Sequence, residues 1–272
     1  MKVAVTGASG FIGGHLVAAL RERGDAVVTP GRAELGDPHT LAEEVAGSAA
    51  IVHLAGGGAS SEKATWEANL GTTERVVGAA REAGVPRVLL ASTVTVTREK
   101  VAAYGASKRA AEEALVFSGL EWTLFRFAFV YGRGESGVFA QLVGLARRLP
   151  MLPVVGSGRL DIAPVHVDDV VAAIVAALDL PDVAQGKTYT IAGPEATLDD
   201  VLRGVYARLG KPMRLWHLPR PVALFLARIP GVPLTRDNVL GMTQEASQDP
   251  WLAQRDLGFE PRPLAAGLDD SL

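Results

Sequence analysis

A glycine-rich turn joins the first predicted strand, residues 2–6, to the first predicted helix, residues 11–23. Its glycines follow a G-x-x-G-x-x-G spacing. This spacing suits a tight turn, a close approach of the backbone to a pyrophosphate, and close packing of the helix on the strand. Free N–H groups at the helix N-terminus favour phosphate there. The turn therefore predicts a dinucleotide site, with a purely structural turn as the alternative. The residues predicted to form this site are Gly7, Ser9, Gly10, Phe11, Ile12 and Gly13.

Apolar, β-branched runs alternate with helical patterns along the first half of the chain. Each helical pattern is long enough to cross a sheet and return, so the order predicts right-handed βαβ units and a parallel sheet. The fold class expected is α/β, a Rossmann-like doubly wound parallel sheet. The predicted strands cover residues 2–6, 26–29, 50–54, 87–91 and 122–127, and the predicted helices cover residues 11–23, 39–46, 66–83 and 104–117.

Proline and glycine become frequent after Pro150. We therefore expect a dinucleotide-binding domain over residues 1–150 and a small C-terminal substrate-binding lobe over residues 151–272. A helical pattern over residues 167–179 is expected to return to the first domain. The other elements expected in the lobe are a strand over 188–191 and a helix over 197–209, and its candidate pocket residues are Arg214, Trp216 and His217.

Charge and composition exclude several classes of protein. The net charge is −3 and no basic face is evident, so a nucleic-acid partner is not expected. The chain has no cysteine, which excludes disulfides, thiolate nucleophiles and iron–sulfur clusters. Its five histidines lack metal-ligand spacing, so no metal site is expected. No G-x-S-x-G nucleophile elbow follows a strand, which argues against a serine hydrolase.

The longest apolar run, residues 170–178, is nine residues long and too short to cross a bilayer. The glycine-rich turn interrupts the N-terminal apolar stretch, so no signal peptide is expected. These features predict a cytoplasmic protein, a monomer or homodimer, that binds a small-molecule substrate. Neither a membrane nor a nucleic acid is expected as a partner.

Tyr104 and Lys108 lie four positions apart in the helical pattern that follows the fourth predicted strand. On a helix they share a face, and an ammonium beside a phenol lowers the pKa of the phenol because it favours the phenolate. Such a tyrosine can exchange a proton with an alcohol or carbonyl near neutral pH. The preceding strand leads into Ser92 and Thr93, whose hydroxyls lie at the edge where open parallel sheets bind ligands. The alternative is an ordinary surface pair.

The end of the second predicted strand bears on the choice of cofactor. NAD sites usually place an acidic residue there, on the ribose hydroxyls. Here the segment reads VTPGR and ends at Arg32. Because a guanidinium can pair with a 2′-phosphate, this pattern favours NADP over NAD. The alternative is that Arg32 is an ordinary solvated charge.

Further motifs are spread over most of the chain. They are TGASGFIGGHL at 6–16, HLAG at 53–56, Asn69-x-x-Thr72, STV at 92–94, YGASK at 104–108, RFAFVYGRG at 126–134, HVDDV at 166–170 and LGFEP at 257–261. Together they resemble the short-chain dehydrogenase/reductase superfamily, in its extended, NAD-dependent epimerase/dehydratase-like branch. The resemblance implies a Rossmann-like fold and a nicotinamide cofactor, and it says much less about the substrate.

The resemblance also implies roles for individual residues. It makes Tyr104 the catalytic acid/base, Lys108 its partner and Thr93 the catalytic hydroxyl, with Ser92 as the neighbour that could substitute. Asn69 falls where related enzymes have a helix-bending asparagine that extends the proton relay. The cofactor-binding residues implied in the same way are Asp37, Leu54, Ala55, Gly56, Asn69, Lys108 and Phe127, while His53 is expected to be structural.

Three departures from the family pattern argue against a sugar-nucleotide substrate. Only eleven positions separate the catalytic hydroxyl from the tyrosine, whereas sugar-nucleotide enzymes of this branch usually carry a longer insertion. Ile162 stands where an arginine usually grips the substrate's diphosphate, and the nearest basic residue is Arg159. Phe127 and Phe129 replace a proline and an asparagine, which predicts a more apolar pocket.

The leading hypothesis is an NADP-dependent oxidoreductase or epimerase-like enzyme. It would move a hydride between nicotinamide and a carbonyl or secondary alcohol of a small substrate, with Tyr104 as acid/base. The alternatives are a sugar-nucleotide epimerase or dehydratase, and a non-catalytic NAD(P)-binding sensor or accessory subunit. Residues 234–239, LTRDNV, favour the last because similar segments occur in accessory subunits of a respiratory complex. The intact tyrosine–lysine pair, which non-catalytic members commonly lose, favours catalysis.

Overall fold

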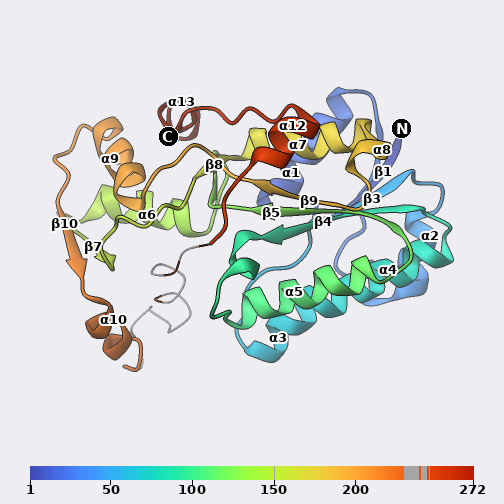
Figure 1. Cartoon of the computed structure of the whole chain (residues 1–272), viewed down its shortest axis with the longest axis horizontal. Coiled ribbons are helices and arrows are strands. Elements are labelled where there is room, and N and C mark those ends of the chain that lie inside the picture. The colour runs from blue at the N-terminus through green and yellow to red at the C-terminus, as the bar shows by residue number, and fades with distance from the viewer. Residues whose placement is uncertain (150, 230–238, 240–243, 245) are drawn as a thin grey trace. The chain divides into compact units, whose positions relative to one another are not determined.

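The computed structural model describes residues 1–149, 151–229, 239, 244 and 246–272 (Figure 1). The chain forms two compact units. Unit 1 comprises Met1–Phe127, Val167–Ile191 and Asp249–Glu260, and unit 2 comprises Ala128–His166, Ala192–Gln248 and Pro261–Leu272. The chain therefore enters the second unit at Ala128, before the boundary expected at residue 150, because the segment that follows Ala128 pairs and packs with elements of unit 2.

Unit 1 is built on a six-stranded parallel sheet of order β2-β1-β3-β4-β5-β9. From β1 the chain moves outward to β2 on one side, and then crosses to β3 and the following strands on the other side. This change of direction makes the sheet doubly wound, as the sequence predicts. The strands are β1 (Lys2–Thr6), β2 (Ala26–Val28), β3 (Ala50–His53), β4 (Arg87–Thr93), β5 (Glu121–Phe127) and β9 (Lys187–Ile191).

Helices cover both faces of this sheet (Figure 1). On one face α1 (Phe11–Glu22) packs against α7 (Val167–Asp179), the helix that was expected to return to the first domain. On the other face α4 (Thr72–Glu82) packs against both α2 (Pro38–Val45) and α5 (Ala103–Val116). The apolar core lies between these helices and the strands, and β4 is buried along its whole length.

The helix predicted over residues 66–83 is divided into three parts. It begins as α3 (Glu62–Trp66), passes through a π-helical turn, η2 (Glu67–Gly71), and continues as α4. A π-turn widens the helix by one residue and often marks a functional position. The remaining short elements of unit 1 are η1 (Glu34–Gly36), η3 (Val94–Thr97), α8 (Pro181–Ala184) and α12 (Trp251–Leu257).

Unit 2 contains two parallel ribbons of two strands each. One pairs β6 (Val130–Tyr131) with β8 (Val165–His166), and the other pairs β7 (Leu152–Val155) with β10 (Leu215–Leu218). Its helices are α6 (Val138–Arg148), α9 (Leu198–Arg208), α10 (Arg220–Leu226) and α13 (Leu264–Ser271). Within the described ranges, no helix has the length and apolar character needed to cross a membrane.

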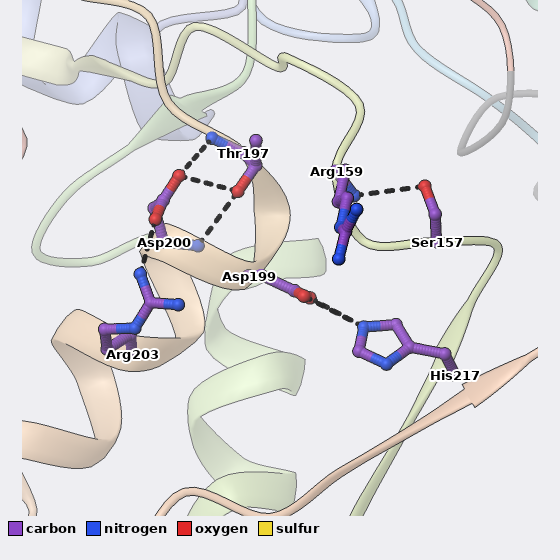
Figure 2. Close-up of polar contacts among 7 residues, drawn as sticks. All are labelled: Ser157, Arg159, Thr197, Asp199, Asp200, Arg203 and His217. Carbon is purple, nitrogen blue, oxygen red and sulfur yellow. Dashed lines mark hydrogen bonds and ion pairs between the residues drawn. The ribbon is translucent and has the colours of Figure 1, made fainter.

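The core of unit 2 gathers large side chains from α6, α9 and α13 around Tyr131. Phe129 and Ile162, two of the residues from which a more apolar pocket was inferred, pack against this core. Their apolar character therefore serves the interior of unit 2. Helix α9 starts with a capping box, in which the side chains of Thr197 and Asp200 each accept a hydrogen bond from the other's backbone N–H (Figure 2).

Candidate functional site

The glycine-rich turn between β1 and α1 has little room for side chains. Gly7 has φ +75°, and a Cβ there would lie 2.6 Å from the backbone nitrogen of Ala55, in the turn after β3. A Cβ at Gly13 would lie only 2.1 Å from the carbonyl oxygen of Gly7. The two turns are thus packed backbone to backbone, which leaves peptide groups rather than side chains to face a ligand.

The N-terminus of α1 has the features of a phosphate site. Its N-cap, Gly10, has no side chain to cap the first turn, and the first turn contains no acidic residue. The first N–H groups of a helix without a capping side chain can bind an anion, and the helix dipole favours negative charge there. The glycines and the bare N-terminus therefore fit the pyrophosphate of a dinucleotide.

Asn69 ties the turn after β3 to the helices beneath it. Its side chain lies in the π-turn η2, is almost fully buried, and accepts a hydrogen bond of 2.9 Å from the N–H of Gly57. The same amide donates to the carbonyl of Gly57 at 3.1 Å and to Ser107 Oγ of α5 at 3.0 Å. The sequence predicts a helix-bending asparagine here, and the structure has Asn69 at the π-turn.

Lys108 is buried near the same turn. Its Nζ donates to the carbonyl of Ala91 at 2.9 Å, and a Cβ at Gly56 would lie 3.0 Å from this nitrogen. Burial lowers the pKa of Lys108 to about 8, and the nearby carboxylate of Glu112 opposes this shift. The pKa of this amine therefore lies not far above neutral pH, and the hydrogen bond to Ala91 anchors the amine to β4.

Tyr104 lies one helical turn before Lys108 on α5. Burial raises the pKa of its phenol, because the phenolate would lose its hydration. From the sequence, the neighbouring ammonium is expected to lower this pKa. That expectation is wrong, because the cost of burying the phenolate is the effect that dominates.

The two hydroxyls at the end of β4 have different surroundings. Thr93 Oγ1 accepts a hydrogen bond of 3.2 Å from the N–H of Thr95, which leaves its own proton free to be donated. Ser92 instead donates to the carboxylate of Glu112, as expected from the alternation of side chains along a strand. Ser92 therefore does not share the environment of Thr93, and the idea that it could substitute loses its geometric basis.

Glu112 is the centre of a buried polar cluster that the sequence analysis missed. Besides the Ser92 hydroxyl, its carboxylate accepts two hydrogen bonds from Arg126, at 3.0 and 2.6 Å. The fork of the guanidinium matches the two carboxylate oxygens. Glu112 lies at i+4 from Lys108 and i+8 from Tyr104, so a tyrosine–lysine–glutamate row along one helix face is the signal that could have found it.

Thr95 is a second residue that the sequence analysis missed. Its Oγ1 is buried and has no hydrogen-bond partner among the described residues. A Cβ at Gly105, the residue after Tyr104, would lie 3.2 Å from this hydroxyl. A buried, unsatisfied hydroxyl next to the helix turn that carries Tyr104 is a candidate to contact a ligand.

The other predicted cofactor residues have varied surroundings. Leu54 and Ala55 form the turn after β3, Ser9 is exposed, Ile12 is half-buried, and the Phe11 ring packs edge-on against His15.

Arg32 is exposed in the loop after β2. Asp37 caps α2, and hydrogen bonds from the Thr40 hydroxyl and from the N–H groups of Thr40 and His39 to its carboxylate lower its pKa. Phe127 is buried and stacks on Phe125 with the ring centroids 6.1 Å apart.

His53 joins β3 to β1. Its Nδ1 shares a hydrogen bond of 2.6 Å with Thr6 Oγ1, and the ring is fully buried. Burial lowers the pKa of His53 to about 3, so the imidazole is neutral at physiological pH. A neutral ring that links two strands fits the structural role expected for it.

Unit 2 contains the loop in which the sequence lacks the diphosphate-binding arginine. Arg159 is exposed, and its backbone N–H donates to Ser157 Oγ at 3.3 Å (Figure 2). The neighbouring Gly158 lies against the carboxylate of Asp199, which His217 Nε2 contacts at 2.9 and 3.1 Å. Of the three candidate pocket residues, His217 is thus paired with Asp199, whereas Trp216 and Arg214 are exposed.

Comparisons with known proteins agree with the fold. A model of the NAD dependent epimerase/dehydratase family matches residues 3–192. The ceramide reductase of Caulobacter vibrioides is 30% identical over 237 residues, which cover 80% of this chain and 74% of that protein. The mitochondrial NADH dehydrogenase [ubiquinone] 1 alpha subcomplex subunit 9 of Arabidopsis thaliana is 28% identical over 248 residues, covering 82% of this chain and 61% of that protein.

A solved structure gives the same result for the fold. MoeE5, in complex with UDP-glucuronic acid and NAD, superposes with a TM-score of 0.81 at 25% identity, covering 100% of this chain and 97% of that one. The family resemblance expected from the motifs is therefore confirmed. The chain belongs to the NAD dependent epimerase/dehydratase family, whose members include NAD-dependent epimerases, dehydratases and reductases of the short-chain dehydrogenase/reductase type.

Proposed function

We propose that this chain is a nicotinamide-dependent reductase of a ketone with an apolar body, and that Tyr104 donates the proton to the new alcohol. The observation that carries the proposal is the partly buried phenol of Tyr104, one helical turn from the buried Lys108. A tyrosine phenol with its ordinary pKa of about 10 is protonated at neutral pH, as a proton donor must be, and the upward shift that burial causes at Tyr104 does not change this. A phenolate would instead suit the removal of a proton from an alcohol.

Different residues of unit 1 would bind the cofactor, hydrogen-bond the substrate and transfer the proton. Gly7, Gly10 and Gly13 would hold the pyrophosphate at the N-terminus of α1, and the bound nicotinamide would supply the hydride. Thr93 would donate its free hydroxyl proton to the carbonyl oxygen of the substrate. Tyr104 would transfer its proton to that oxygen, and the Lys108 ammonium would favour the resulting phenolate.

The cofactor we propose is NAD, although the loop after β2 led the sequence analysis to favour NADP. A Cβ at Gly31 would lie 2.8 Å from a carboxylate oxygen of Glu34, so an acidic group lies beside Arg32 in this loop. A carboxylate there suits the ribose hydroxyls of NAD and repels the 2′-phosphate of NADP. The relative MoeE5 was solved with NAD, which supports the same choice.

The substrate class rests on the loop around Arg159. Ile162, at the position of the missing arginine, packs against the core of unit 2, and Gly158 lies against a carboxylate. A diphosphate held by Arg159 would therefore meet the negative charge of Asp199. A buried dianion without a basic partner is strongly disfavoured, so an uncharged carbonyl compound fits better. The similarity to a ceramide reductase supports an apolar substrate.

Replacing Tyr104 with phenylalanine tests the chemistry. With NADH and a panel of ketones that carry alkyl chains, we expect turnover in the unmodified protein and a loss of about 10²-fold or more in Tyr104→Phe, with unchanged NADH affinity. The matched control is Tyr206→Phe, because Tyr206 is a buried tyrosine of unit 2 whose hydroxyl has no hydrogen-bond partner among the described residues. The proposal is wrong if Tyr104→Phe turns over the same ketone as fast as the control.

The same panel includes UDP-glucose and UDP-glucuronic acid to test the first alternative. Turnover of either compound, lost in Arg159→Ala, would replace the proposal with a sugar-nucleotide epimerase. An accessory-subunit role is the second candidate, favoured by the similarity to the plant NADH dehydrogenase subunit. The LTRDNV segment that suggested this role lies, apart from Val239, outside the described residues. Tight NADH binding without turnover of any ketone or nucleotide sugar would support that role.

A further inference from the structure

The ribbon of β7 and β10 in unit 2 has one buried face and one open face. Side chains alternate between the faces of a strand, and Leu215 and Leu152, paired in register, belong to an apolar cluster that includes Leu202 of α9. Trp216 and its register partner Pro153 therefore lie on the opposite face, and both are exposed. Met151, two positions before Pro153, is exposed as well.

Helix α10 extends this open face. Its Ala223 is buried in a cluster with Leu218, and by the two-residue period Leu218 lies on the same face as Trp216. The opposite side of the helix and its extension carries Val222, Phe225 and Ile229 at the i, i+3, i+7 spacing of one helical face. Together with Met151 and Trp216 these side chains form what we call the apolar patch, and each is between 41% and 64% exposed.

The segments that form the apolar patch carry several basic side chains and no acidic ones. No aspartate or glutamate occurs in residues 136–160 or 201–236. Arg147, Arg148, Arg214, Arg220 and Arg228 are exposed, and none makes an ion pair with a described residue. The net charge of −3 for the whole chain conceals this local excess of positive charge.

We infer that the apolar patch and its arginines form a docking surface for an anionic lipid bilayer. Exposed tryptophan and aliphatic side chains can enter the boundary between headgroups and acyl chains, while arginines around them contact anionic headgroups. A second copy of this chain is a poorer partner, because it would bring the same arginines face to face. A nucleic acid is a poorer partner too, because Met151, Val222 and Ile229 have no ring on which a base can stack.

This inference concerns peripheral binding and does not rest on the proposed reductase activity. No membrane partner is expected from the sequence, because its longest apolar run is too short to cross a bilayer. A peripheral contact needs no spanning segment. The pairing of β7 with β10 joins the segment of Arg147 and Arg148 to the segment of Arg214, Arg220 and Arg228. A bilayer surface is also where apolar ketones would be concentrated.

Flotation with lipid vesicles tests the docking surface directly. We expect the full chain to float with phosphatidylcholine vesicles that contain phosphatidylglycerol, and to stay behind with phosphatidylcholine alone. Raising the salt from about 0.1 M to about 1 M shortens the Debye length from about 10 Å to about 3 Å and should release the protein. Equal binding to both kinds of vesicle, or none to the anionic ones, would overturn the inference.

Paired variants distinguish vesicle binding through this surface from general effects of charge on binding. Phe225→Asp should weaken binding to the anionic vesicles at least about tenfold, whereas Phe117→Asp, which changes an exposed phenylalanine of unit 1, should not. Arg220→Glu should weaken binding about fivefold or more, with Arg21→Glu of α1 as its control. Equal losses in a variant and its control would overturn the inference, and Arg220→Glu keeps the test decisive if Phe225→Asp does not fold.

Fluorescence shows whether the apolar patch enters the lipid. Anionic vesicles should shift the tryptophan emission of the protein to the blue, and Trp216→Phe should remove the shift while keeping most of the flotation. An unshifted emission would mean that Trp216 stays in water, against the inference. Analytical ultracentrifugation tests whether a second copy of this chain covers the apolar patch instead. If the protein forms a dimer that Phe225→Asp dissociates, and if it binds no vesicles, the patch is an interface between copies and the inference is overturned.

Discussion

Unit 1 buries charged side chains around α5, whereas unit 2 exposes its arginines along β10 and α10. Lys108 and Glu112 are each about 95% buried, and both are held by hydrogen bonds to neighbouring strands. Arg220 and Arg228 are exposed and have no ion-pair partner among the described residues. Buried charge is tolerated only with partners, so it fixes local geometry. Exposed charge without a partner is available to molecules outside the chain.

The largest effect that this contrast predicts is on the stability of unit 1. Glu112→Gln removes the carboxylate that pairs with Arg126 and accepts from Ser92, and should cost about 3–5 kcal/mol of unfolding free energy. The neighbouring Glu113 is exposed, so Glu113→Gln should change that free energy by less than about 0.5 kcal/mol. Urea denaturation measures both. Similar small losses in the two variants would show that the Glu112 pair is effectively solvated.

The second prediction uses pH to detect the buried lysine. The pKa of Lys108 is lowered from 10.5 in the unfolded chain to about 8 by burial, so above pH 8 the unfolded chain holds more protons there. Stability should therefore rise by about 1.4 kcal/mol per pH unit between about pH 8 and pH 10. Above pH 10 the raised pKa of Tyr104 acts in the opposite direction, because stability linked to the neutral phenol is lost as pH rises.

Lys108→Met should abolish this rise, and Lys63→Met, on an exposed position of α3, should keep it. The measurement is the free energy of unfolding against pH, without added cofactor. Glu112→Gln should lower the pKa of Lys108 further, since the carboxylate raises it, and the rise should begin at a lower pH. A rise that persists in Lys108→Met would assign it to another group.

The third prediction concerns two adjacent glycines of α1. A Cβ at Gly13 would lie 2.1 Å from a backbone oxygen, so Gly13→Ala should destabilise the protein by about 1–3 kcal/mol and weaken NADH binding. Gly14 has open space, with its nearest contact at 3.9 Å. Gly14→Ala should therefore stabilise the helix by up to about 1 kcal/mol. Thermal denaturation and NADH titration of both variants test the pair, and equal behaviour would refute the close approach at Gly13.

Unit 1 could be predicted from sequence far better than unit 2. Strands such as β4 are buried on both sides and read as continuous apolar runs, and the glycine turn has a fixed place between β1 and α1. The raised pKa of Tyr104 could not be predicted, because it depends on how deeply the phenol is buried. The link between Ser92 and Glu112 depends on how α5 sits on β4, which spacing alone does not give.

The errors in unit 2 have a common physical cause. Phe129 and Ile162 were interpreted as evidence for a more apolar pocket, whereas both side chains are half-buried and pack against the core of unit 2. An apolar residue can serve a core, a pocket or a surface, and only the packing of distant segments distinguishes these uses. The apolar patch was missed for the same reason, since its residues come from two segments that meet only in the β7–β10 ribbon.

The smallest expected effect is on the free energy of unfolding when an apolar side chain on the surface of unit 2 is truncated. It distinguishes apolar residues of the surface from those of the core. Phe139 is 3% exposed in the core, whereas Phe225 is 64% exposed in the apolar patch. Because a side chain already in water loses little burial when it is truncated, Phe225→Ala should change the unfolding free energy by no more than about 0.5 kcal/mol. Phe139→Ala should cost about 3–5 kcal/mol, as truncation of a buried phenylalanine leaves a cavity. Urea denaturation compares the two variants, and a cost at Phe225 as large as that at Phe139 would mean that Phe225 packs against other side chains. The ring would then not be free to enter a bilayer, and the contrast between the buried charges of unit 1 and the open face of unit 2 would not hold at this helix.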